Sequence, residues 1–149
     1  MLDDIKKSTV IKKRCEYVKE CIDKAAEEAR EQKLNPVKRF AYIVDKYYLA
    51  LYDIYEVETK WRDNYHTVYD FDGIVDEDVE IYALEYLDPY FQDMIKEGRR
   101  LAQKVVNSEY ICDLMDNYEK LLEYMNSPIV KDWDSLIKGT EVHVKRKKI

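Results

Sequence analysis

The stretch that decides the fold is residues 36–69, which read PVKRFAYIVDKYYLALYDIYEVETKWRDNYHTVY. Apolar and aromatic residues recur there every three or four positions, which is the spacing of one face of an α-helix. The first stripe contains Phe40, Val44, Tyr47, Leu51, Ile54, Trp61, Tyr65 and Val68, with Glu58 interrupting it. A second stripe contains Tyr48, Tyr52, Tyr55, Thr59, Arg62, His66 and Tyr69. One helix over the whole stretch is about 50 Å long, so we expect it to cross the domain as a central helix.

Helical patterns continue on both sides of this stretch. Before it, residues 3–34 carry a heptad seam of Ile11, Cys15, Val18, Ile22, Ala25 and Ala29. Asn35 and Pro36 then suit the N-cap and the first position of the central helix. After it, we expect a short helix over 76–87, a fourth restarted by Asp88 and Pro89, a fifth from 107–108 to 125, and a last short one over 127–139.

These elements predict an all-α fold, an antiparallel bundle of about five helices with one long central helix and a short basic C-terminal tail. We expect residues 1–139 to form a single all-α domain and residues 140–149 to form the tail, with little strand outside Val142–Val144. Three Gly and three Pro in 149 residues are few for a sheet-rich fold with many tight turns.

The same sequence bears on the compartment. No uncharged run approaches the ~18 residues of a membrane-spanning helix, and residues 1–7 lack the apolar core of a signal peptide. Cys15, Cys21 and Cys112 are odd in number and lack metal-ligand spacing, which favours reduced thiols. We therefore expect a cytoplasmic protein, in the host cytoplasm if the chain is viral.

Charge is distributed unevenly along the chain. Between Asp63 and Asp93 there are ten carboxylates and no Lys or Arg, whereas the rest of the chain holds 21 acids against 25 bases. Seven aromatic residues lie in the same window, so it is not a solvated acidic tail. A solvated face kept for solubility is one interpretation. An acidic surface that binds a basic partner is the other, because close like charges destabilise the isolated fold.

Several catalytic chemistries are poorly supported. Asp63 and His66 have the carboxylate-x-x-His spacing of di-iron bundles, but such sites need a second copy of the motif, and the only other histidine is His143. Acidic pairs of the kind that bind Mg²⁺ in all-α pyrophosphohydrolases lie more than fifty residues apart here, at 28–31 and 85–88. The glycines are too scattered for a phosphate loop. We expect no metal site, no cofactor and no enzymatic activity.

A ribonuclease is kept as one alternative. Arg62, His66 and Tyr69 share a predicted helix face, similar to the Arg and His of small all-α ribonucleases of the HEPN type, where an Arg holds phosphate and a His acts as acid or base. Three residues separate Arg62 from His66, whereas four to six separate the pair in that family.

The favoured hypothesis is a non-enzymatic binding protein, of the kind that a virus or phage uses as an inhibitor. Its acidic, Tyr-bearing surface would mimic nucleic acid and occlude the basic groove of a nucleic-acid-handling protein. The predicted partner-binding residues are Tyr48, Tyr52, Tyr55, Tyr69, Asp70, Asp72, Asp76, Glu77, Asp78, Glu85 and Asp88. The runner-up, ahead of the ribonuclease, is a homo-oligomeric or virion structural protein whose tyrosine stripe makes self-contacts and whose basic termini touch nucleic acid. Direct nucleic-acid binding is disfavoured by a net charge of −6.

Overall fold

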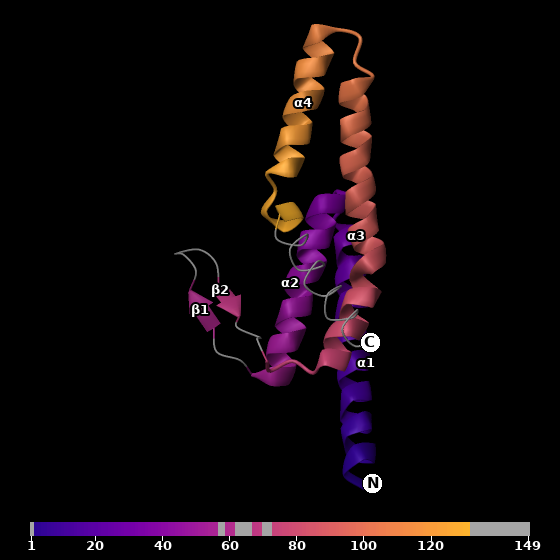
Figure 1. Ribbon diagram of the computed structural model, residues 1–149, viewed down its shortest axis with the longest axis vertical. Coiled ribbons are helices and arrows are strands. Elements are labelled where there is room, and N and C mark those ends of the chain that lie inside the picture. Colours follow the sequence, from indigo (N-terminus) through magenta and orange to yellow (C-terminus); the bar gives the residue numbers. More distant parts are fainter. Residues whose placement is uncertain (1, 57–58, 62–66, 70–72, 132–149) are drawn as a thin grey trace, which may run out of the picture. The chain divides into compact units, whose positions relative to one another are not determined.

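Helices make up most of the computed structural model, which describes residues 2–56, 59–61, 67–69 and 73–131. The elements are α1 (Leu2–Glu31), α2 (Pro36–Tyr55), β1 (Thr59–Trp61), β2 (Thr67–Tyr69), α3 (Glu77–Val106) and α4 (Ile111–Met125) (Figure 1). The predicted all-α class is confirmed. Within the described ranges, no helix is both long and apolar enough to span a membrane.

The chain divides into two compact units. Unit 1 comprises Met1–Gln32 and Tyr42–Leu87, and unit 2 comprises Lys33–Ala41 and Asp88–Ile149. The predicted boundary between a domain ending at residue 139 and a basic tail lies outside the described residues, as does the Val142–Val144 segment. That boundary stays a prediction.

The long central helix was a wrong prediction, because α2 ends at Tyr55. Glu56 adopts a left-handed conformation with φ of 49°, which commonly terminates a helix. β1 and β2 then pair antiparallel, with Lys60 opposite Val68. The β-branched and aromatic residues of this stretch suit a pleated strand as well as a helix. Consequently Tyr69 does not share a helix with the α2 tyrosines, and Arg62 and His66 lie outside the described residues.

The prediction that one helix ends before Asp88 and another begins at Pro89 was also wrong. α3 runs unbroken through Pro89, so Asp88 caps no helix. Proline inside a helix removes one backbone hydrogen bond and costs roughly 3 kcal/mol. Buried residues on both sides of it, Leu87 and Met94, supply packing that offsets this cost. The two 30-residue helices of the chain are therefore α1 and α3, and neither is α2.

Two other predicted helix starts are confirmed, and the predicted start at residues 107–108 is wrong. The Asn35 side chain accepts a hydrogen bond from the Lys38 amide at 2.9 Å, and Pro36 occupies the first position of α2. The carbonyl of Asp76 accepts from the Glu80 amide, so Asp76 is the N-cap of α3. The Ser108 hydroxyl instead donates to the Lys104 carbonyl at the end of α3, and α4 begins at Ile111. Beyond α4 the helical turn starting at residue 128 is described through residue 131.

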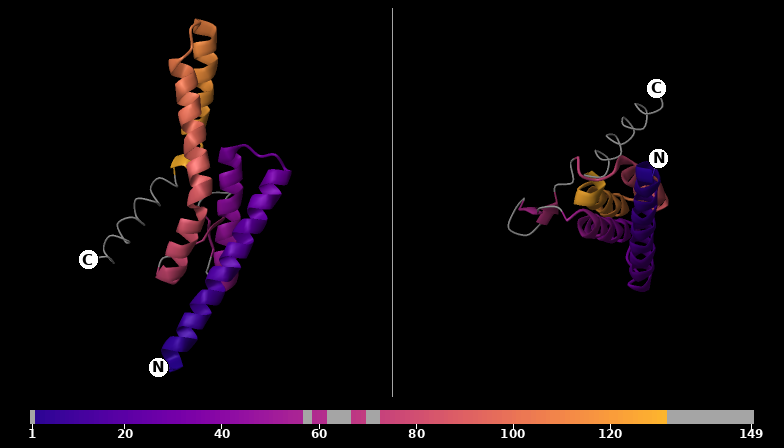
Figure 2. Two further views of the ribbon diagram at one scale, coloured as in Figure 1. Left: turned by 90° about the vertical axis from the view of Figure 1, so that its right-hand side faces the viewer. Right: turned by 90° about the horizontal axis from the view of Figure 1, so that it is seen from below.

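The core of unit 1 lies between α1, α2 and the first part of α3 (Figure 2). Its buried residues are Val18, Ile22, Ala25, Ala26, Ala29, Ile43, Val44, Tyr47, Ala50, Leu51, Val79, Ala83 and Leu87. The alanines of α1 allow the close approach of a neighbouring helix. Four of the six residues of the predicted α1 seam are therefore core residues, as are Val44, Tyr47 and Leu51 of the predicted α2 stripe.

Unit 2 is built on an antiparallel hairpin of α3 and α4, visible in Figures 1 and 2. Phe40, Met94 and Leu101 are buried, and the Phe40 and Phe91 rings lie 5.8 Å apart. The Tyr124 hydroxyl donates to the Met94 carbonyl at 2.9 Å. Gly98 provides the space for that ring, because a Cβ at Gly98 would lie 2.6 Å from two of its carbons.

Candidate protein-binding surface

A polar cluster links α1, the end of α2 and the start of α3 in unit 1. Arg14 forms an ion pair with Asp76, and its guanidinium lies 4.8 Å from the centre of the Tyr55 ring. The Tyr55 hydroxyl donates to the Asp76 carboxylate at 2.8 Å and accepts from the Asp76 amide at 3.1 Å. Two predicted binding residues, Tyr55 and Asp76, thus have partners within unit 1.

The pKa values of this cluster follow from its contacts. Partial burial alone would raise the pKa of Asp76, but hydrogen bonds from Tyr55 and Arg14 outweigh it and bring that pKa below its ordinary value. Burial would likewise lower the pKa of Arg14, and the hydrogen bond to Asp76 reverses the shift. Arg14 and Asp76 are 62 residues apart, so no local sequence pattern predicts their pairing.

The junction of α1 with α3 is marked by a tyrosine pair. The Tyr82 and Tyr86 rings are stacked, with centres 6.1 Å apart and planes 6° from parallel. The Tyr86 hydroxyl donates to the Asp23 carboxylate, and the Lys19 ammonium lies 5.9 Å from the centre of the Tyr86 ring. Asp23 therefore marks the side of α1 that borders these tyrosines.

Three more carboxylates share the side of α1 that carries Asp23. They are Glu16, Glu20 and Glu27. Along the helix the four acids follow one another at steps of four, three and four residues, which places all of them on one helix face. All four are exposed. Sequence reasoning missed this row because the lysines of α1, including Lys19 beside the Tyr86 ring, balance its charge. The spacing of four, three and four residues was nevertheless visible in the sequence.

Exposed acids of α3 lie beside the tyrosine pair. Asp78 precedes Tyr82 by four residues and Glu85 follows it by three, so both flank its ring on the same helix face. The Asp78 charge also reaches α1: burial raises the pKa of the Cys15 thiol, and Asp78 adds to that rise. We call the following set the acidic surface of unit 1: Glu16, Glu20, Asp23, Glu27, Asp78, Tyr82, Glu85 and Tyr86.

The remaining predicted acids are placed differently. Glu77 is exposed and follows the N-cap directly, so its side chain is turned by roughly 100° from that of Asp78. Asp88 is exposed in unit 2 and accepts a hydrogen bond from Gln92 at 3.4 Å. Asp70 and Asp72 lie outside the described residues. Part of the acidic window also has a structural purpose, since acids in the first turn of a helix stabilise its positive end.

The predicted tyrosine stripe lies on another side of unit 1. Tyr55 faces the start of α3, and Tyr48 and Tyr52 precede it by seven and three residues on the same side of α2. The neighbouring Tyr47 is buried, which raises its pKa, and the Glu80 charge adds to the rise. Tyr47 and Tyr55 therefore border the side of α3 that carries Asp76 and Glu80, whereas Tyr86 borders α1. Tyr69 belongs to β2, and its side chain is outside the described part.

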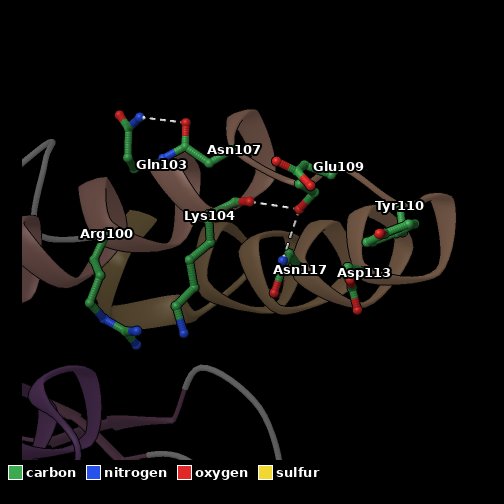
Figure 3. A pocket seen from close by; sticks show the side chains of 9 residues that line it. Arg100, Gln103, Lys104, Asn107, Glu109, Tyr110, Asp113 and Asn117 are labelled. Atoms are coloured by element: carbon green, nitrogen blue, oxygen red, sulfur yellow. Dashed lines mark hydrogen bonds between the residues drawn. The ribbon is translucent and has the colours of Figure 1, made fainter.

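Unit 2 contains a polar recess at the tip of the α3–α4 hairpin (Figure 3). It is lined by Arg100, Gln103, Lys104, Asn107, Ser108, Glu109, Tyr110, Asp113 and Asn117. Arg100 is paired with Glu97, and Ser108 accepts a hydrogen bond from Asn117 at 3.0 Å. The recess is open and is lined by both basic and acidic side chains, so its lining does not point to one class of ligand. Among the described residues, no three His, Cys, Asp or Glu side chains are grouped closely enough to hold a metal ion.

Searches against protein-family models, curated proteins and solved structures return no significant match to this chain.

Proposed function

We propose that this protein is a non-enzymatic inhibitor of the viral or phage type, which places the acidic surface of unit 1 in the basic groove of a nucleic-acid-handling protein. The observation that carries the proposal is the union of two carboxylate sets from α1 and α3 around one stacked tyrosine pair. Occlusion of the groove would exclude nucleic acid.

The geometry supports mimicry in two respects. The α1 carboxylates recur about once per helical turn, roughly every 5 Å, which is the same order as the rise of about 3.4 Å per phosphate along a DNA strand. The tyrosine pair is held by its stacking and by the Tyr86–Asp23 hydrogen bond. Aromatic side chains already held in place lose little conformational entropy on binding, which suits an interface.

The experiment is affinity capture of partners by the full-length chain, followed by the salt dependence of binding for each captured protein. The test variant replaces Glu20, Glu27, Asp78 and Glu85 with Lys. The matched control replaces Asp93, Glu109, Asp113 and Asp116, exposed acids of unit 2, with Lys. Both variants gain the same positive charge, so only the location differs.

We expect the test variant to lose binding and most of the salt dependence, while the control variant keeps the larger part of both. Nucleic acid should compete with the wild-type protein for the captured partner. Equal binding by the test variant and the wild type would contradict the proposal and leave the acidic surface as a solvated face.

A further inference from the structure

Helix α4 presents an apolar stripe to solvent. Its members recur at steps of four and three residues, and none of the α4 residues is buried. The stripe contains Ile111, Met115, Tyr118, Leu122 and Met125, with exposed fractions from 38% to 77%. An apolar heptad stripe of this length is the pattern of a helix that packs against another helix.

The contacts with α3 do not cover this stripe. The hydrogen bonds of Asn117 and Tyr124 mark the side of α4 that faces α3. Asp113 lies to one side of that line, in the polar recess (Figure 3). Leu114, Tyr118 and Leu122 are turned to the other side by the helical rotation of roughly 100° per residue.

Helix α3 carries a second stripe on the same side of the hairpin as the apolar stripe of α4. Gly98 and Met94 mark its contact with Tyr124, and Arg100 and Lys104 line the recess. On the opposite side, residues at steps of four, three and four form a second stripe. This stripe contains Ile95, Arg99, Ala102 and Val106. Val106 is 77% exposed and Arg99 is also exposed.

We infer that these two stripes, together called the hairpin face, bind the hairpin face of a second copy of this chain. The two α3–α4 hairpins form an antiparallel four-helix bundle, in which α3 of each copy packs on α4 of the other. The inference is independent of the function proposed for unit 1, since the hairpin face lies entirely in unit 2.

The charges at the edges of the hairpin face select this arrangement. The α3 edge carries Arg99 and Lys96, and the α4 edge carries Glu119 just beyond Met115. A two-fold axis parallel to the helices places the α3 edge of one copy against the α4 edge of the other, so opposite charges meet. An axis perpendicular to the helices would instead place the α3 edge of one copy against the α3 edge of the other, so that like charges would meet.

Symmetry also fixes the register. A two-fold axis parallel to the helices leaves every residue at its own height along the bundle. Gly98 lies against Tyr124, so Arg99 is level with the last turns of α4. Arg99 of one copy therefore lies within about one helical turn of Glu119 in the other, beside the exposed Tyr118 and Leu122. Arginine and tyrosine are both enriched at protein interfaces.

The first test is the mass of the full-length chain in solution, measured by sedimentation across a concentration series. We expect a species of twice the 18.0 kDa chain mass at micromolar concentration. Leu122→Lys should weaken the dimer by roughly tenfold or more, because a leucine leaves the apolar interface. The matched control is Asp113→Lys, in the polar recess on the other side of α4, which should change the dissociation constant little.

The second test concerns the register. Arg99→Glu alone and Glu119→Arg alone should each weaken the dimer, and the double charge swap should restore it to near the wild-type affinity. A chain that stays monomeric at every concentration overturns the inference, whether unit 1, the C-terminal segment or another protein covers the hairpin face. A dimer that tolerates Leu122→Lys, or that the double swap does not restore, overturns it as well.

Discussion

The Arg14–Tyr55–Asp76 cluster should contribute measurably to the stability of unit 1, and Asp76→Ala tests this. The substitution removes the carboxylate that accepts from the Tyr55 hydroxyl at 2.8 Å and that pairs with Arg14. A hydrogen bond to a charged acceptor contributes about 1.5–3 kcal/mol. Because the Asp76 side chain is 34% exposed, we take the lower end of that range. The ion pair adds roughly 0.5 kcal/mol.

The expected loss is therefore about 2 kcal/mol in the free energy of unfolding. Urea denaturation followed by far-ultraviolet circular dichroism measures it. Asp78→Ala is the control, since Asp78 also occupies the first turn of α3 and its loss should cost about 0.5 kcal/mol. Equal losses for Asp76→Ala and Asp78→Ala would refute a specific role for the cluster.

The cluster also predicts a dependence on pH. The folded-state pKa of Asp76 lies below its ordinary value of 3.8, so the unfolded chain takes up the proton first as the pH falls. The stabilisation is complete above about pH 5 and is lost as the pH drops through the folded-state pKa. The difference in stability between the wild type and Asp76→Asn should therefore shrink below about pH 4. The pH range from about 6 to about 3 includes the ordinary pKa of an aspartate. A stability difference between the two chains that stays constant over this range would show that Asp76 is not paired as described.

Two further predictions concern individual contacts. The hydrogen bond to Asp53 raises the pKa of Tyr17 to about 12, so Asp53→Asn should bring that pKa back toward 10 in an ultraviolet titration. An unchanged titration would contradict the contact. Gly98→Ala should destabilise the fold by about 1 kcal/mol despite the better helix propensity of alanine, because its Cβ would displace the Tyr124 ring. In a Tyr124→Leu background, Gly98→Ala should instead stabilise the fold, because the ring that its Cβ would displace is absent. Urea denaturation of the wild type, both single variants and the double variant measures both effects. Destabilisation by Gly98→Ala in both backgrounds would contradict the contact.

The periodicity of the sequence was sufficient to determine the helical class. A repeat of three and four residues appears in α1, α2, α3 and α4, and the buried residues of unit 1 follow it closely. The start of α2 was also predictable, because Asn35 and Pro36 satisfy local requirements that no distant residue alters. The segment from Asp63 to Asp93 without Lys or Arg, and the apolar stripe of α4, could also be recognised in the sequence, because both are local patterns.

Tertiary structure decided where competing local signals were nearly equal. Pro89 reads as a helix start, but packing on both sides of it keeps α3 continuous. The residues after Tyr55 suit a helix stripe and a strand alike, and pairing of Thr59–Trp61 with Thr67–Tyr69 selects the strand. The binding surface needed tertiary structure most. Tyr86 joins Asp23 across 63 positions, and Arg14 joins Asp76 across 62. Local sequence patterns extend over one or two helical turns. The sequence by itself therefore determined the helices and their polar and apolar faces. Which carboxylates share a surface was decided only by the packing of α1 on α3.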